Sequence, residues 1–433
     1  MCTGLITGCL TSLSCSVLQK VNSSIANVTR LYYGSMLMTS TIVSTLMLSD
    51  WVSHEMKDVV SNYWFSDLVI QPDVPKEVIG SLAVYRIMSG VCLFHLCLSV
   101  MVINVKETTE KRAIIHNDGM CIKLIMYGGT VTSMFFISSD VFIYLTTWPF
   151  KVGGAAFIML QIMFLISFIY DLYEGLVELA YKQTNENMNE RTFIWVNCIS
   201  LFLTIGGYIF TIVTGIILTL NHIQSEDGCP QEVIASGFNI IMMLLVSVLS
   251  VSDYVRGAQN GAGNLNSIFQ ASLISAYASY LILTAFVNHP DQNCHLWDGG
   301  HATITKGVSL ILTFIAIIWS TVRSGSNDFL MDREHLLPLE DIEGNSNESS
   351  EVGYSYSQFH IMFALASMYI ANILTRWGDI DMIPGEGVED PFKIGISDSE
   401  FSVWIKLLSA VSCYLFYLWI MLAPPLFPYR NFS

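Results

Sequence analysis

Long apolar runs recur along this chain and are separated by short polar segments. A helix needs about 20 predominantly apolar residues to cross the hydrocarbon core of a bilayer. The pattern therefore predicts an all-α, polytopic transmembrane protein with about ten spans. The predicted spans are residues 31–48, 79–105, 120–138, 152–181, 193–220, 231–250, 267–287, 304–321, 356–376 and 401–423.

The fourth run is longer than a bilayer requires and carries a polar stripe. Spacings of three or four residues place five side chains on one helix face: Ser167, Asp171, Glu174, Glu178 and Lys182. A helix over residues 152–182 would be roughly 45 Å long, against a hydrocarbon core of about 30 Å. We expect it to tilt or project, with its acidic stripe facing protein or water. The pattern predicts an internal strut.

Composition agrees with a membrane protein. The 433 residues are 52% hydrophobic and only 13% charged, whereas soluble domains carry about 25% charged residues. The net charge of −16 argues against a nucleic-acid partner, which favours clustered Lys and Arg. The distribution of basic residues favours cytosolic N- and C-termini. Four basic residues fall at the predicted outer ends of spans: Arg86, Lys306, Arg376 and Lys406.

Two cysteines fall in predicted outer loops, where oxidation can occur. Cys229 and Cys294 are therefore either a disulfide or two free thiols. The four N-glycosylation sequons (N-x-S/T) are at Asn22, Asn27, Asn347 and Asn431. We expect them to lie on the cytosolic side and therefore not to be glycosylated.

Residues 323–354 are rich in Ser, Asn, Asp and Glu, which predicts a flexible cytosolic loop. Asp332, Leu336 and Leu337 within it fit an acidic dileucine sorting motif that clathrin adaptors bind. A chance match in a flexible loop is the alternative.

Five ordered blocks of residues resemble one family, the serine incorporators (SERINC, also called TDE or TMS proteins). The resemblance covers nearly the whole chain after about residue 20. The blocks are Val84-Tyr85-Arg86 with Phe94-His95; Arg112-Ala113-Ile114 with Asn117 and Lys123; Gln270-Ala271-Ser272 through Asn288 and Cys294; Tyr354 through Tyr369; and Trp404 through Pro424 with Arg430. The chain departs from the family at Ser167, where the family has an Asp, and at Asp171, where the family has a small polar residue.

The resemblance implies a single integral-membrane domain over residues 1–433, built as two helical bundles crossed by a long tilted fourth helix with a lipid-accessible groove. It also implies one of two activities. The first is passive, ATP-independent phospholipid scrambling. The second is an accessory role in incorporating serine into phosphatidylserine and sphingolipids, together with lipid-synthesis enzymes. We also expect a location in an endomembrane or the plasma membrane, with membrane phospholipids as partners, and a homo-oligomer is a further expectation.

No catalytic motif, cofactor motif or metal motif accompanies these blocks, so we expect no enzyme activity, no cofactor and no metal. Asp171 and Glu174 could bind a cation, which is the weaker alternative. A scramblase needs a polar groove, because a charged head group in hydrocarbon costs several kcal/mol or more. The groove candidates are Ser167, Asp171, Glu174, Glu178, Arg86 and Lys406.

Each groove candidate also has a purely structural interpretation. Arg86 and Lys406 could extend to the outer head groups without forming a groove. The three carboxylates could be held by Lys182 or Arg191. A secondary transporter is the least favoured function, because the hydropathy indicates no inverted repeats.

Overall fold

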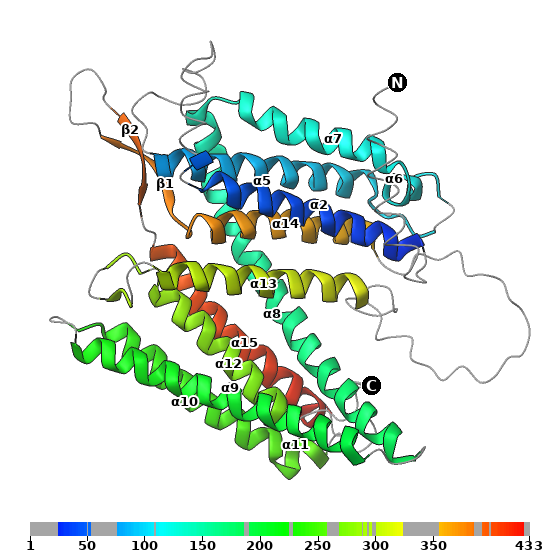
Figure 1. The fold of residues 1–433 in the computed structure, drawn as a ribbon, viewed down its shortest axis with the longest axis vertical. Coiled ribbons are helices and arrows are strands. Elements are labelled where there is room, and N and C mark those ends of the chain that lie inside the picture. Colours follow the sequence, from blue (N-terminus) through cyan, green and yellow to red (C-terminus); the bar gives the residue numbers. More distant parts are fainter. Residues whose placement is uncertain are drawn as a thin grey trace, which may run out of the picture. The chain divides into compact units, whose positions relative to one another are not determined.

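The computed structural model describes residues 25–49, 51–52, 76–107, 110–185, 190–224, 228–257, 268–287, 289–291, 294–296, 300–323, 355–384, 392–397 and 400–427. Its elements are labelled in Figure 1. The chain divides into two compact units. Unit 1 comprises Met1–Pro72, Ile79–Phe142 and Ile317–Met368, and unit 2 comprises Asp73–Val78, Ile143–Ala316 and Tyr369–Ser433.

Unit 1 is helical. It contains α2 (Ile25–Met47), most of α5 (Lys76–Met101), α6 (Ala113–Asn117), α7 (Met120–Ser133) and the 3-10 turn η1 (Met134–Phe136). The first residues of α8 (Ser139–Asn185), the end of α13 (Gly300–Arg323) and the first part of α14 (Tyr356–Leu374) also belong to it.

Unit 2 contains most of α8 (Ser139–Asn185) and α13 (Gly300–Arg323), and the end of α14 (Tyr356–Leu374). Its other helices are α9 (Glu190–Gln224), α10 (Pro230–Val251), α11 (Asp253–Gly257), α12 (Ile268–Val287) and α15 (Glu400–Leu426). The strands β1 (Asp379–Pro384) and β2 (Phe392–Ser397) form an antiparallel hairpin that pairs Asp379 with Ser397.

The prediction of a polytopic helical membrane protein is confirmed. Within the described part of the chain, seven helices are long and apolar enough to cross a membrane: α5, α8, α9, α10, α12, α14 and α15. Two shorter apolar helices, Met120–Phe136 and Ile304–Trp319, and helix α2 coincide with the remaining three predicted spans.

Two details differ from the sequence prediction. Helix α8 begins at Ser139, well before the predicted residue 152, and continues through Pro149. Proline removes one helical hydrogen bond and usually kinks or ends a helix, but α8 continues past Pro149. The segment between the predicted spans 356–376 and 401–423 contains the β1–β2 hairpin, which the apolar pattern did not indicate.

Helix α12 is the most enclosed helix of unit 2, and it runs beside α9, α10 and α15 (Figure 1). Ser272 Oγ donates to the Thr204 carbonyl at 2.6 Å, and Gly207 allows the two helices to approach there. Asn239 Nδ2 donates to Ser279 Oγ at 2.8 Å, and the Tyr414 hydroxyl donates to Asn239 Oδ1 at 2.7 Å. Small residues and interhelical hydrogen bonds of this kind stabilise helix packing in lipid.

The predicted Cys229–Cys294 disulfide is confirmed, with the two Cα atoms 5.2 Å apart. Cys229 is the N-cap residue of α10, and Cys294 lies in the connection between α12 and α13. Both residues are buried. The bond therefore ties the start of one helix to the connection between two others, at one end of unit 2.

In unit 1, the close approach of α5 and α7 depends on Gly90. A Cβ at this position would overlap the backbone of Val131. We expect Gly90→Ala to destabilise the protein by about 1–3 kcal/mol. The new methyl group would meet backbone atoms of α7, which cannot rotate away as the end of a flexible side chain can. Thermal unfolding of the purified protein measures this. Gly129→Ala is the matched control, since nothing lies within 4 Å of its new Cβ. A Gly90→Ala protein as stable as that control would contradict the close packing.

Stability should fall as the pH drops below about 6.5, because the folded protein keeps His116 neutral. Burial, followed by the positive charges of Lys123 and Arg30, lowers the pKa of His116 to about 3. In the unfolded chain the pKa is about 6.5, so the unfolded state binds the proton first. Between these values, His116 should contribute a loss of about 1.4 kcal/mol per pH unit. Unfolding midpoints measured between pH 5 and 8 should depend less on pH in His116→Gln than in wild type. His295→Gln, a change in unit 2, should leave the wild-type slope; equal slopes in all three proteins would refute the prediction.

Candidate functional site

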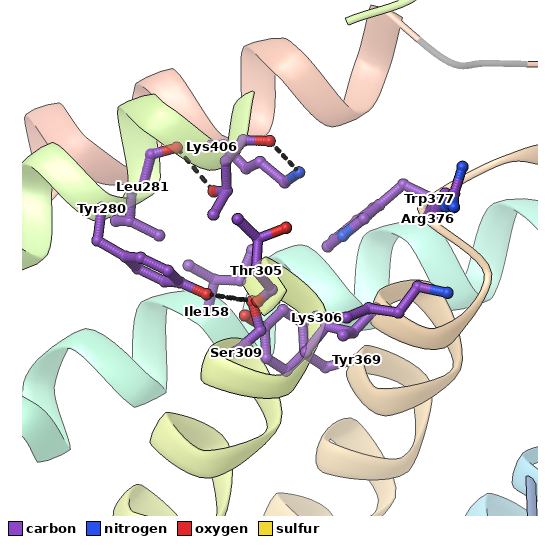
Figure 2. Close-up of a pocket in the computed structure, with 12 residues that line it drawn as sticks. Ile158, Tyr280, Leu281, Thr305, Lys306, Ser309, Tyr369, Arg376, Trp377 and Lys406 are labelled. Carbon is purple, nitrogen blue, oxygen red and sulfur yellow. Dashed lines mark hydrogen bonds between the residues drawn. The ribbon is translucent and has the colours of Figure 1, made fainter. Parts of the chain in front are cut away.

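A small pocket lies at one end of unit 2, where four helices end or begin. Its walls come from the last turns of α12, the first turns of α13, the segment after α14 and the start of α15, with Ile158 of α8 at one side. Figure 2 shows its side chains. The lining residues are Ile158, Tyr280, Leu281, Thr284, Thr305, Lys306, Ser309, Tyr369, Ile373, Arg376, Trp377 and Lys406.

Among the described residues, the lining has three basic side chains and no carboxylate. Arg376 is close enough to Lys306 for the two charges to repel each other. Among the described residues, no ion pair within 4 Å involves Lys306, Arg376 or Lys406. Lys406 is buried and Lys306 is half-buried, whereas Arg376 is exposed. Like charges around a buried ammonium group are unfavourable unless an anion compensates them. The pocket therefore has the charge of an anion-binding site, which we name the basic pocket.

Lys406 makes the strongest case for an anion. It is only 7% exposed, and its Nζ donates to the Thr284 carbonyl at 2.9 Å (Figure 2). An ammonium group carries three donors, and one neutral carbonyl does not neutralise its charge. Lys406 lies near the start of α15, at the same end as the C-terminus of α12, so it is near one end of its span.

Hydroxyl groups complete the polar wall of the basic pocket. The Tyr280 hydroxyl donates to the Thr305 carbonyl at 3.0 Å and is also hydrogen-bonded to Ser309 Oγ (Figure 2). The Tyr369 ring packs on Phe157, with centroids 5.3 Å apart. The hydroxyl groups of Tyr280 and Ser309 are thus held in place by contacts between α12 and α13. The Tyr369 ring, packed on Phe157, forms another part of the pocket wall.

The backbone that presents Arg376 is strained. Arg376 and Trp377 have φ values of +57° and +60°, a left-handed conformation that favours glycine. The Trp377 N–H donates to the Asn372 carbonyl at 2.7 Å, and the Arg376 N–H donates to that of Ile373 at 3.2 Å. These bonds form a Schellman C-cap, in which the position of Arg376 is usually glycine. An arginine in a conformation that costs about 1 kcal/mol or more is typical of a functional position.

The volume of the basic pocket limits what can enter it. The cavity measures about 30 Å³. One buried water needs about 10–15 Å³ on the same measure, so the cavity admits one or two oxygen-sized groups. It therefore suits the oxygens of a phosphate or carboxylate, with the rest of the ligand outside.

Of the six predicted groove residues, only Lys406 lines the basic pocket. Ser167 and Asp171 are partly buried on α8, and Glu174 is exposed there. Glu178 belongs to the same helix, but its side chain lies outside the described part. The continuous helix confirms that these four positions share one face, as the spacing predicted.

Arg86 lies in unit 1 and is 1% exposed. Its guanidinium donates to the Met134 carbonyl, to the Ile137 carbonyl at 2.8 Å and to Ser139 Oγ at 3.2 Å. It also lies 4.7 Å from the centre of the Phe142 ring. These hydrogen bonds hold the turn between α7 and α8 against α5. Arg86 therefore has a structural role in unit 1, whereas the sequence analysis named it as a candidate for the lipid groove.

Several predicted features fall outside the described residues. They are the sorting motif Asp332, Leu336 and Leu337, most of the loop 323–354, and the sequons at Asn22, Asn347 and Asn431. Lys306 and Arg376, by contrast, are functional candidates that the sequence showed only as basic residues at span ends.

Comparison with known proteins agrees with these observations. The spanning helices define a multi-pass helical membrane protein. The sequence profile of the serine incorporator (Serinc) family matches residues 2–336 and 334–430, so the chain belongs to the serine incorporator family. A probable serine incorporator of Monosiga brevicollis is 29% identical, with 98% of this chain and 96% of that protein aligned. Serine incorporator 3 of Bos taurus is 26% identical, with 95% and 94% aligned.

Proposed function

We propose that this protein moves phospholipids between the two leaflets of a membrane without ATP, and that the basic pocket receives the phosphate of the head group. One observation carries this proposal: three basic side chains line one small pocket at the end of a helical bundle, and none of the described residues that line it is a carboxylate. Lysine and arginine bind phosphate through charge-assisted hydrogen bonds. The small cavity accommodates phosphate oxygens while the acyl chains remain in the bilayer.

The disulfide supports the side of the membrane that we assign to the pocket. Disulfides persist in oxidising compartments and are rare in the cytosol. Cys294 lies in the connection between α12 and α13, and the last turns of α12 and first turns of α13 line the pocket. In our proposal the pocket therefore faces the lumenal or extracellular side. The protein resides in an endomembrane or the plasma membrane, and both chain termini lie in the cytosol.

The acidic stripe of α8 provides the second part of the proposed path. Asp171, Glu174 and Glu178 follow the apolar part of the helix and lie toward the predicted cytosolic end. Charged side chains in a span retain water around them, which lowers the barrier for a head group. In this proposal the basic pocket accepts the phosphate, and the stripe keeps the inner half of the path hydrated.

The test is a fluorescent-lipid quenching assay on purified full-length protein in liposomes without ATP. We expect quenching to exceed the outer-leaflet fraction that empty liposomes show. Glu174→Leu combined with Glu178→Leu should slow the exchange. Quenching equal to that of empty liposomes, from protein that is folded by size-exclusion chromatography, would refute scrambling.

The family name favours a second function, presentation of serine to lipid-synthesising enzymes. The carboxylate of serine has the charge that the basic pocket accepts. This function predicts saturable binding of free serine to the purified protein and no lipid exchange. Calorimetric titration with serine, compared with alanine, separates the two proposals.

A further inference from the structure

Tyr277, Tyr417 and Gln161 each place a buried oxygen atom inside unit 2 without a hydrogen-bond partner among the described residues. The atoms are the hydroxyl oxygens of the two tyrosines, on α12 and α15, and Oε1 of the glutamine, on α8. The Tyr417 side chain is 0% exposed and that of Gln161 is 1% exposed. Burial of a polar oxygen without a hydrogen bond is unfavourable, and ordered water commonly supplies the bond that the protein does not. We name these atoms the unpaired oxygens.

Two of the three residues adjoin the basic pocket along their helices. Tyr277 lies one turn from Tyr280 on α12, and Tyr280 lines the pocket. Gln161 lies one turn from Ile158 on α8, which also lines the pocket. Residues three apart share a helix face, so both unpaired oxygens belong to faces that continue the pocket wall.

Tyr417 lies farther along the face of α15 that carries Lys406. The two residues are eleven positions apart, which is about 16 Å along a helix and brings them back to the same face. Cys413 lies between them on this face, and Tyr277 is close enough to Cys413 for the two groups to interact electrostatically. Tyr277 is therefore beside the part of α15 that leads from the basic pocket to Tyr417.

The Tyr277 hydroxyl has polar neighbours that belong to the basic pocket. The rings of Tyr277 and Tyr280 stack with their centroids 6.2 Å apart. Tyr369 of α14 is close enough to Tyr277 to interact with it electrostatically. Tyr280 and Tyr369 both line the pocket (Figure 2). A water bound to Tyr277 would therefore be next to the pocket.

Hydroxyl groups from other helices also surround Tyr417. The ring of Tyr170 on α8 lies 6.4 Å from that of Tyr417, measured between centroids. Tyr208 of α9 is close enough to Tyr417 to interact with it electrostatically. The Tyr208 hydroxyl is hydrogen-bonded to Ser247 Oγ of α10 at 2.6 Å. A hydroxyl can both donate and accept, so these groups can bind water from several sides.

We propose that unit 2 binds a file of water molecules that begins at the basic pocket, passes Tyr277 and ends at Tyr417. A buried water typically makes about three hydrogen bonds to polar groups that are otherwise unsatisfied. The unpaired oxygens provide some of these partners, and the neighbouring hydroxyl groups provide the others. The file ends beside Tyr170, which precedes Asp171 of the acidic stripe. Use of this water by a lipid head group rests on the proposed function, whereas the water site itself does not.

A dry cluster of tyrosines is the competing interpretation. A dry, unpaired hydroxyl carries a desolvation cost that nothing offsets, so replacing it with hydrogen would stabilise the fold. A hydroxyl bonded to water instead loses a hydrogen bond when it is removed. The hydroxyl groups that reach Tyr417 from α8, α9 and α10 favour the hydrated site.

Radiolytic hydroxyl-radical footprinting of the full-length protein in lipid nanodiscs tests the water file. Radicals formed from bound water oxidise the side chains next to it, and tandem mass spectrometry assigns the oxidation to single residues. We expect Tyr277 and Tyr417 to be oxidised several-fold faster than Tyr414. Tyr414 is the matched control, because it is also 0% exposed on α15 but its hydroxyl donates to Asn239 Oδ1 at 2.7 Å. Oxidation of Tyr417 no faster than that of Tyr414 would overturn the proposal, and this comparison needs no variant.

Thermal unfolding of Tyr417→Phe provides a second test. Loss of the bond to water should lower the unfolding temperature, whereas a dry cluster predicts an increase. An unfolding temperature equal to or above that of wild type would overturn the water file. Lipid exchange by the wild-type protein is measured separately. Oxidation of Tyr417 without lipid exchange would therefore support the water file and refute the proposed function.

Discussion

Arg376→Gly is expected to make the protein more stable and to slow phospholipid exchange at least about tenfold. Glycine relieves the left-handed backbone at φ +57°, which costs about 1 kcal/mol for other residues. It also removes the repulsion between Arg376 and Lys306. The loss of one charge-assisted hydrogen bond to phosphate, about 1.5–3 kcal/mol, accounts for the slower exchange. Thermal unfolding and the liposome assay measure the two effects on the same preparation.

Asn104→Gly is the matched control for this result. Asn104 has the same φ of +57°, but it follows α5 in unit 1 and does not line the basic pocket. It should gain similar stability and exchange lipid at the wild-type rate. If Arg376→Gly exchanged lipid as fast as Asn104→Gly, the basic pocket would have no part in transport.

Removal of the disulfide should lower the stability of the protein more than Gly90→Ala does. Cys229 and Cys294 are 65 residues apart, and closing a loop of that length is worth about 4 kcal/mol in the chain-entropy account. We expect Cys229→Ser with Cys294→Ser to unfold at a clearly lower temperature than wild type. Reductant should lower the wild-type midpoint toward that of the double variant and leave the variant unchanged.

Cys97→Ser is the control for the disulfide, because Cys97 is a free, exposed cysteine. Its unfolding temperature should match wild type with and without reductant. A double variant as stable as this control would show that helix packing alone holds the end of unit 2.

The sequence predicted the spans well because apolar length is a local property. It placed α12 and α15 within a few residues, and it paired Cys229 with Cys294 as one of two alternatives. The predicted start of the fourth span, residue 152, lies 13 residues after the start of α8 at residue 139. The prediction followed the uninterrupted apolar run, which begins after Pro149 and Lys151. Contacts with neighbouring helices can stabilise a helix that contains a proline. The apolar pattern of the sequence does not show those contacts.

The polar clusters inside the fold were harder to predict because they depend on distant residues. Lys306, Arg376 and Lys406 were each recognised as basic residues at the outer ends of spans, but only the fold brings them to one pocket. The hydrogen bonds that link His95, His116 and His360 in unit 1 could not be inferred either, since the three residues come from three separate elements.

The small size of the cavity bears on which lipids the protein would carry. A space of about 30 Å³ encloses phosphate oxygens but not a choline, ethanolamine or serine substituent. Recognition limited to the group that all glycerophospholipids share cannot tell them apart. A protein working in this manner would erase the compositional asymmetry of its bilayer, so the host membrane must restore that asymmetry with energy-driven pumps.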